Sequence, residues 1–172
     1  MVRLCALMSL RSRLIHDVTL GPANTGEVTY AKQLKVVPQS LTLFDRCYLP
    51  AELLINWQQK QDDAHWLVPV KGNTKYRILE TFSAGDHRVE MQVSAHARKQ
   101  GASLPETWQA RLIESGDGSG SLKGFITSLT DPIEEDVKQF VLPDKRKRPK
   151  KGPFVSQKPR IPFTQSILSE RC

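Results

Sequence analysis

A chain of 172 residues with 39% apolar content is long enough to form one globular domain around its own core. No apolar run approaches the roughly 18 residues needed to cross a membrane. The three cysteines, Cys5, Cys47 and Cys172, fit neither a metal-binding spacing nor a disulfide framework, which favours a reducing cytoplasm. We also expect no signal peptide, because the apolar N-terminus continues into Arg11-Ser-Arg13 without a small-residue cleavage site.

The net charge of +7 belongs to the C-terminal end of the chain. Residues 1–140 carry 16 basic and 16 acidic side chains, whereas residues 141–172 carry nine basic and two acidic ones. The charge therefore says little about the partners of the first 140 residues.

The first 60 residues predict an alternation of strands and helices. In chain order, the pattern predicts one or two strands over 2–20, a loop at 21–26, a weak helix over 28–37, a buried strand over 41–45 and an amphipathic helix from Pro50. Leu41, Leu43 and Phe44 run directly into Asp45. This places a carboxylate at the carboxyl end of a buried strand, where open α/β sheets bind ligands. An ordinary strand-end or helix-capping aspartate is the alternative.

The rest of the chain changes character twice. Short alternating runs separated by turn residues predict about five strands between residues 65 and 129. Beyond Asp131-Pro132 the pattern decays into one or two helical turns near 134–140, the basic run Lys145-Arg-Lys-Arg-Pro-Lys-Lys151 and scattered prolines. Such a composition buries too little apolar surface to offset the entropy of ordering, so we expect residues 133–172 to be disordered.

Several of these segments resemble the insertion-sequence-four transposases. The segment Ser40-Leu-Thr-Leu-Phe-Asp-Arg46 is similar to the family's second-aspartate motif, and His65-Trp-Leu-Val-Pro-Val-Lys71 with Lys75-Tyr76 also fits. The segment Val2-Arg-Leu-Cys-Ala-Leu-Met8 resembles the strand after the first catalytic aspartate, and Ile126-Thr-Ser-Leu-Thr-Asp-Pro132 resembles the strand before the third acidic residue. The resemblance implies an α/β, ribonuclease H-like DDE core in residues 1–132, with a β-rich insertion over about 65–125.

The resemblance also implies a chemistry. These transposases cut and rejoin DNA at insertion-sequence ends by phosphoryl transfer, with two Mg²⁺ ions held by carboxylates. Asp45 is then the catalytic and metal-binding residue, and Lys71 and Lys75 are candidates to contact DNA phosphates, with solvated lysines as the alternative. DNA and an intact transposase are the expected partners, without a small-molecule substrate or a membrane, in the bacterial cytoplasm.

The chain departs from the family at the other two acidic positions. The first aspartate belongs upstream of the equivalent of Val2, and Asp17 does not match it. The third acidic residue belongs to a Tyr-x2-Arg-x3-Glu-x6-Lys motif, but no tyrosine follows Tyr76. Glu134, Glu135 and Glu170 are therefore not assigned, and Cys47 replaces the glycine usual after the Asp-Arg pair.

These departures predict an incomplete core and a transposase fragment that is inactive by itself. Whether the chain is an enzyme stays open, since one carboxylate is a poor two-metal site. A non-catalytic DNA-binding protein that interferes with an intact transposase is the alternative, and a decayed product without function is the third interpretation. For the tail we favour out-of-frame sequence over non-specific nucleic-acid binding or a simple solvated end. Loss of the first strand is expected to leave an edge or gap in the sheet.

Overall fold

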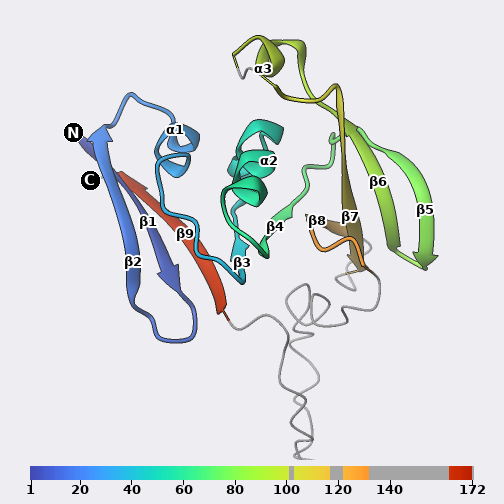
Figure 1. The fold of residues 1–172 in the computed structure, drawn as a ribbon, viewed down its shortest axis with the longest axis horizontal. Helices are drawn as coiled ribbons and strands as arrows, with labels where there is room; N and C mark the ends of the chain where they lie inside the picture. The colour runs from blue at the N-terminus through green and yellow to red at the C-terminus, as the bar shows by residue number, and fades with distance from the viewer. Residues whose placement is uncertain (101–102, 117–121, 132–162, 172) are drawn as a thin grey trace, which may run out of the picture.

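A single mixed sheet organises the computed structural model, which describes residues 1–100, 103–116, 122–131 and 163–171 (Figure 1). Its nine strands follow the order β2-β1-β9-β3-β4-β8-β7-β6-β5 in the described part of the chain. Strand β3 runs parallel to both of its neighbours, and the other pairs are antiparallel. The strands are β1 (Val2–Ser9), β2 (Ile15–Pro22), β3 (Ser40–Leu43), β4 (Ala64–Pro69), β5 (Arg77–Ser83), β6 (Asp86–Gln92), β7 (Thr107–Gly116), β8 (Leu122–Thr127) and β9 (Phe163–Arg171).

The helices are short and lie between strands. They are α1 (Glu27–Ala31), the 3-10 helix η1 (Arg46–Tyr48), α2 (Ala51–Lys60) and α3 (Ala95–Gln100). Helix α2 begins one residue later than Pro50, which serves as its N-cap. Helix α1 is shorter than the predicted 28–37 and ends at Ala31, after which the backbone N–H groups of Gln33 and Leu34 bond three residues back and turn the chain. No helix in the described ranges is long and apolar enough to cross a membrane.

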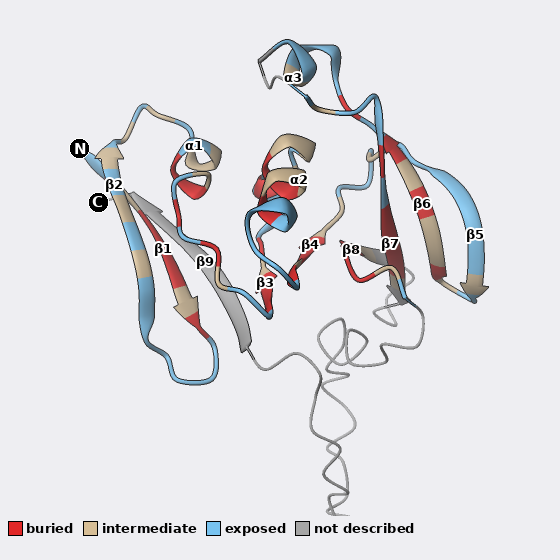
Figure 2. Cartoon of the chain, viewed as in Figure 1, coloured by how far each residue is buried: buried red, intermediate tan, exposed pale blue. Residues whose placement is uncertain are grey.

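The main hydrophobic core lies where α1 and α2 pack against the sheet. Leu53, Leu54 and Trp57 of α2 are all buried there, as the helical spacing predicts. The Trp57 ring meets Phe44 edge to face at 5.0 Å between centroids, an arrangement favoured by the ring quadrupoles. Trp66 and Trp108 are also buried. Figure 2 shows the contrast with the edge strands β2 and β5, which are largely exposed.

The predicted strand-rich region is confirmed. Strands β4 to β8 fall between Ala64 and Thr127 and continue the same sheet rather than forming a separate one. Antiparallel pairing of β5 with β6, β6 with β7 and β7 with β8 accounts for the alternating sequence pattern. Whether this region is an insertion into an older core stays a prediction.

Within the tail for which the sequence predicts disorder, residues 163–171 form β9, which pairs with β1 on one side and with β3 on the other. Two neighbouring strand edges supply backbone hydrogen-bond partners to such a strand whatever its apolar content. The basic run 145–151 and the predicted helical turns at 134–140 lie outside the described residues.

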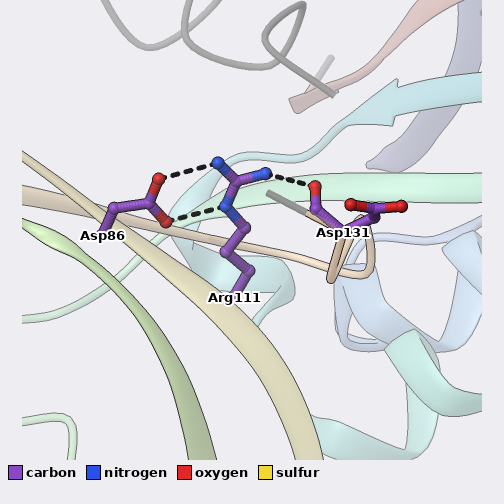
Figure 3. A network of polar contacts seen from close by, with 3 residues as sticks. All are labelled: Asp86, Arg111 and Asp131. Carbon is purple, nitrogen blue, oxygen red and sulfur yellow. Dashed lines mark hydrogen bonds and ion pairs between the residues drawn. The ribbon is translucent and has the colours of Figure 1, made fainter. Parts of the chain in front are cut away.

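A buried ion pair joins the strands at the other end of the sheet (Figure 3). Arg111 of β7 donates from Nε and Nη2 to the two carboxylate oxygens of Asp86 in β6, each at 2.7 Å. Its Nη1 donates to the backbone carbonyl of Asp131 at 2.7 Å, which fixes the chain after β8. The side chains of Arg111 and Asp86 are only 0% and 3% exposed, so each charge depends on the other for compensation.

We predict that Asp86→Ala lowers the free energy of unfolding by about 3–5 kcal/mol, because it leaves the Arg111 guanidinium buried without its counter-charge. Glu106→Ala is the matched control. It breaks the exposed Arg98–Glu106 pair and is expected to cost less than about 1 kcal/mol. Urea denaturation of both variants measures the difference, and equal losses would contradict this account of the pair.

Candidate functional site

Asp45 lies two residues beyond the end of β3, as the sequence predicts, and its side chain is exposed. It is also the N-cap of η1, with its Oδ1 accepting a hydrogen bond from the backbone N–H of Cys47 at 3.1 Å. The strand-end position and the helix-capping role, set out as alternatives from the sequence, therefore occur together. A cap of this kind positions the carboxylate but uses part of the hydrogen-bonding capacity of one carboxylate oxygen.

A second carboxylate approaches from α1. The thiol of Cys47 donates to Oε2 of Glu27, the first residue of α1, with 3.4 Å between sulfur and oxygen. Partial desolvation of the thiol, followed by the Glu27 hydrogen bond and the charge of Asp45, raises the pKa of Cys47 to about 12. Cys47 thus remains a neutral thiol at physiological pH, between two carboxyl groups contributed by distant parts of the sequence.

The donor set around Asp45 does not fit a two-Mg²⁺ site. Within the described residues, no group of three or more His, Cys, Asp or Glu side chains is placed to hold a metal ion. Glu27 and Cys47 are the nearby donors, but a protonated thiol is not a metal ligand and Mg²⁺ prefers oxygen. Glu134 and Glu135 lie outside the described residues, and Glu170 lies on β9. No catalytic step through a metal follows from this arrangement.

A basic pocket of about 640 Å³ lies at the start of β5 and brings together Lys71 and Lys75. Its other basic residue is Arg77, which pairs with Glu90 at 2.6 Å. No ion pair engages Lys71 or Lys75 in the part of the chain that the structure describes. The positive charge that is left uncompensated in the pocket is therefore theirs. The pocket is lined by Leu49, Ala51, Lys71, Asn73, Thr74, Lys75, Tyr76, Arg77, Glu90, Met91, Gln92 and Trp108.

Two lining residues connect the pocket to the segment that carries Asp45. Leu49 caps the end of η1 and Ala51 is the first residue of α2, only a few residues after Asp45 in the chain. The turn before β5 is fixed by a hydrogen bond from the backbone N–H of Lys71 to the Thr74 hydroxyl at 3.0 Å. Sequence reasoning identified the two lysines but missed Arg77 and the contribution of Trp108, whose position depends on the pairing of β6 with β7.

Comparison with known proteins supports a single family. Residues 1–152 match the family model described as the transposase DDE domain, a match that runs past residue 132. The chain is 30% identical over 134 residues to the transposase InsG for insertion sequence element IS4 of Escherichia coli K12, covering 77% of this chain and 30% of that protein. It is 33% identical over 81 residues to the putative transposase InsZ of the same organism, covering 46% and 27%. The chain thus spans less than a third of the length of these relatives. No solved structure gives a significant match.

We predict that Cys47 is alkylated by iodoacetamide at pH 8 more than tenfold slower than glutathione, because a pKa near 12 leaves roughly a thousandfold less thiolate than a pKa of 9. Glu27→Gln is expected to accelerate the reaction, since it removes a negative acceptor that favours the neutral thiol. Glu106→Gln, at an exposed site on another part of the fold, is the control. Mass spectrometry of the peptide containing Cys47 gives the rates, and alkylation as fast as that of glutathione would refute the prediction.

Proposed function

Because this chain belongs to the transposase DDE-domain family, we propose that it is a non-catalytic transposase fragment. Its ancestral activity is metal-dependent DNA cleavage and strand transfer at insertion-sequence ends. The observation that carries the proposal concerns Asp45, two residues beyond the end of β3. Among the described residues, it belongs to no group of three or more His, Cys, Asp or Glu side chains that could hold a metal ion.

Two-metal chemistry explains why a small number of carboxylates near Asp45 argues against catalysis. Two-metal phosphoryl transfer stabilises the attacking and leaving oxygens with ions about 3.5–4 Å apart, which takes several carboxylates in one place. Among the side chains that the structure describes, Asp45 and Glu27 supply two carboxyl groups here, and Cys47 between them is held as a neutral thiol. Mg²⁺, the expected ion, sheds water reluctantly and would gain little from such a site. We therefore assign the chain no strand cleavage of its own.

A second function, DNA binding, is favoured by the basic pocket. The positively charged Lys71 and Lys75 line a pocket that is also lined by the aromatic residues Tyr76 and Trp108. Lysines at such a site contact phosphates and supply affinity rather than sequence choice. A fragment that binds DNA without cutting it would occupy the ends on which an intact transposase acts, and so reduce transposition.

The first test follows nicking. We predict that the purified full chain does not nick a labelled duplex carrying the terminal sequence of an IS4-type element, with Mg²⁺ or Mn²⁺ present, above the level of buffer alone. Asp45→Asn should be indistinguishable from the unaltered chain. Nicking that depends on metal and disappears in Asp45→Asn, but not in Glu106→Gln, would show that other residues complete the site and would overturn the proposal.

The second test follows the salt dependence of DNA binding. Each phosphate contact contributes about 0.9 to the slope of log affinity against log salt concentration. We predict that Lys71→Ala/Lys75→Ala lowers this slope by about 2, and that Lys35→Ala, an exposed lysine beyond α1, leaves it unchanged. Fluorescence anisotropy with the same duplex measures the slopes.

A third variant in this experiment separates the pocket from the tail. It neutralises the basic run 145–151 and keeps the full length, because truncation of the chain before this run would also remove β9. If the slope falls in this variant and not in the Lys71/Lys75 variant, the DNA-binding surface lies in the tail and not in the pocket.

A further inference from the structure

One interior strand of the sheet, β9, comes from outside the family-related part of the chain. The family match ends at residue 152, whereas β9 covers Phe163–Arg171. In the sheet, β9 nevertheless lies between β1 and β3, and both of these strands belong to the matched region (Figure 1). A segment outside the family match thus fills an interior position of the sheet, between two strands that lie inside the match.

The pairing is extensive on both edges of β9. Seven residue pairs join it to β1, from Arg3 opposite Arg171 to Ser9 opposite Gln165, in antiparallel register. Four pairs join it to β3, from Ser40 opposite Phe163 to Leu43 opposite Ser166, in parallel register. Among the described strands, β9 is the one that connects the β1–β2 hairpin to the rest of the sheet.

Removing β9 would leave two inward-facing strand edges. Unpaired backbone N–H and C=O groups at such edges are costly when buried and promote pairing with other chains when exposed. The hydrogen bonds of a sheet are made by backbone groups, so the position selects for an extended segment of the right direction rather than for a particular sequence. This accounts for occupation by a segment unrelated to the family.

We propose that the space between β1 and β3 is a strand-acceptor slot and that residues 163–171 of the same chain are its occupant, added by β-augmentation within one molecule. The family-related region then depends on an unrelated C-terminal segment for a closed sheet. The inference concerns folding and assembly, and its tests use no DNA, so it stands or falls independently of the proposed function.

The slot lies next to the candidate site. Strand β9 runs parallel to β3, and Ser166 lies opposite Leu43, two residues before Asp45. The remaining residues of β9 continue in the direction of Asp45. The occupant of the slot therefore forms part of the frame on which the Asp45 turn is built.

A disulfide test reads the register directly. Met8→Cys/Ser166→Cys is introduced into a chain with Cys47→Ser and Cys172→Ser, leaving Cys5, which is buried. Met8 and Ser166 are opposite each other, and Cα atoms of opposite antiparallel residues lie about 4.5–5.5 Å apart, within the disulfide range. The matched control, Met8→Cys/Ile167→Cys, is one residue out of register, so its two side chains belong to opposite faces of the sheet.

Air oxidation at micromolar protein concentration, followed by non-reducing mass spectrometry, gives three outcomes. A disulfide within one chain, formed at least tenfold faster in the in-register pair than in the control, supports the proposal. A covalent dimer would overturn the assignment of the occupant to the same molecule and would indicate exchange between two copies. Absence of the disulfide, or equal rates in both variants, would contradict the placement of residues 163–171 beside β1 and overturn the proposal.

Amide hydrogen exchange supplies a measurement that does not rely on new cysteines. Ser166→Pro removes an N–H from a strand paired on both edges, where proline is not tolerated, whereas Ser166→Thr keeps the N–H. We expect exchange in β1 and β3 to accelerate at least tenfold in the proline variant and to stay unchanged in the threonine variant. Unchanged protection of β3 in Ser166→Pro would contradict the pairing and overturn the proposal.

Discussion

Backbone pairing on both sides of the four-residue strand β3 is the constraint on which the rest of the structure depends. It runs parallel to β4 and to β9, so it can be stable only when both neighbours are in place. Its residues are mostly buried, and the chain leaves it directly into the Asp45 turn and α2. The core beneath α2, the position of Asp45 and the connection to the β1–β2 hairpin all require this short strand to be held from both edges.

The charged groups between β6 and β7 and those around Asp45 follow opposite patterns. Arg111 and Asp86 form a buried pair in which each charge is matched, and this pair secures strands β6, β7 and the end of β8. Around Asp45, by contrast, Glu27 adds a like charge and the thiol of Cys47 stays neutral. A buried matched pair fixes structure, whereas two carboxyl groups beside a neutral thiol offer few ligands for a metal ion. Lys71 and Lys75 line a separate pocket.

Local patterns predicted most elements and the place of Asp45, because strand alternation and the helical spacing of Leu53, Leu54 and Trp57 are properties of short segments. Long-range pairing was not predictable in the same way. Residues 163–171 show no clear alternation, and their extended form depends on edges more than a hundred residues away. Arg111 lies in an alternating strand where a charged residue suggests solvent, and only the pairing of β6 with β7 reveals its buried partner. The contact of Glu27 with Cys47 likewise depends on how α1 packs.

The position of β9 has a consequence for how the protein is made. Strand β9, which lies between β1 and β3, is synthesised after every other described strand, and it pairs with β1 at a separation of about 160 residues. Contacts so distant in the chain are slow to form because the entropy of closing the loop is lost before any pairing is gained. During synthesis β1 and β3 would wait with open edges, exposed to chaperones, proteases and other nascent chains. A frameshift or early stop between β8 and β9 would therefore affect the whole sheet, although it leaves the sequence of the preceding strands unchanged.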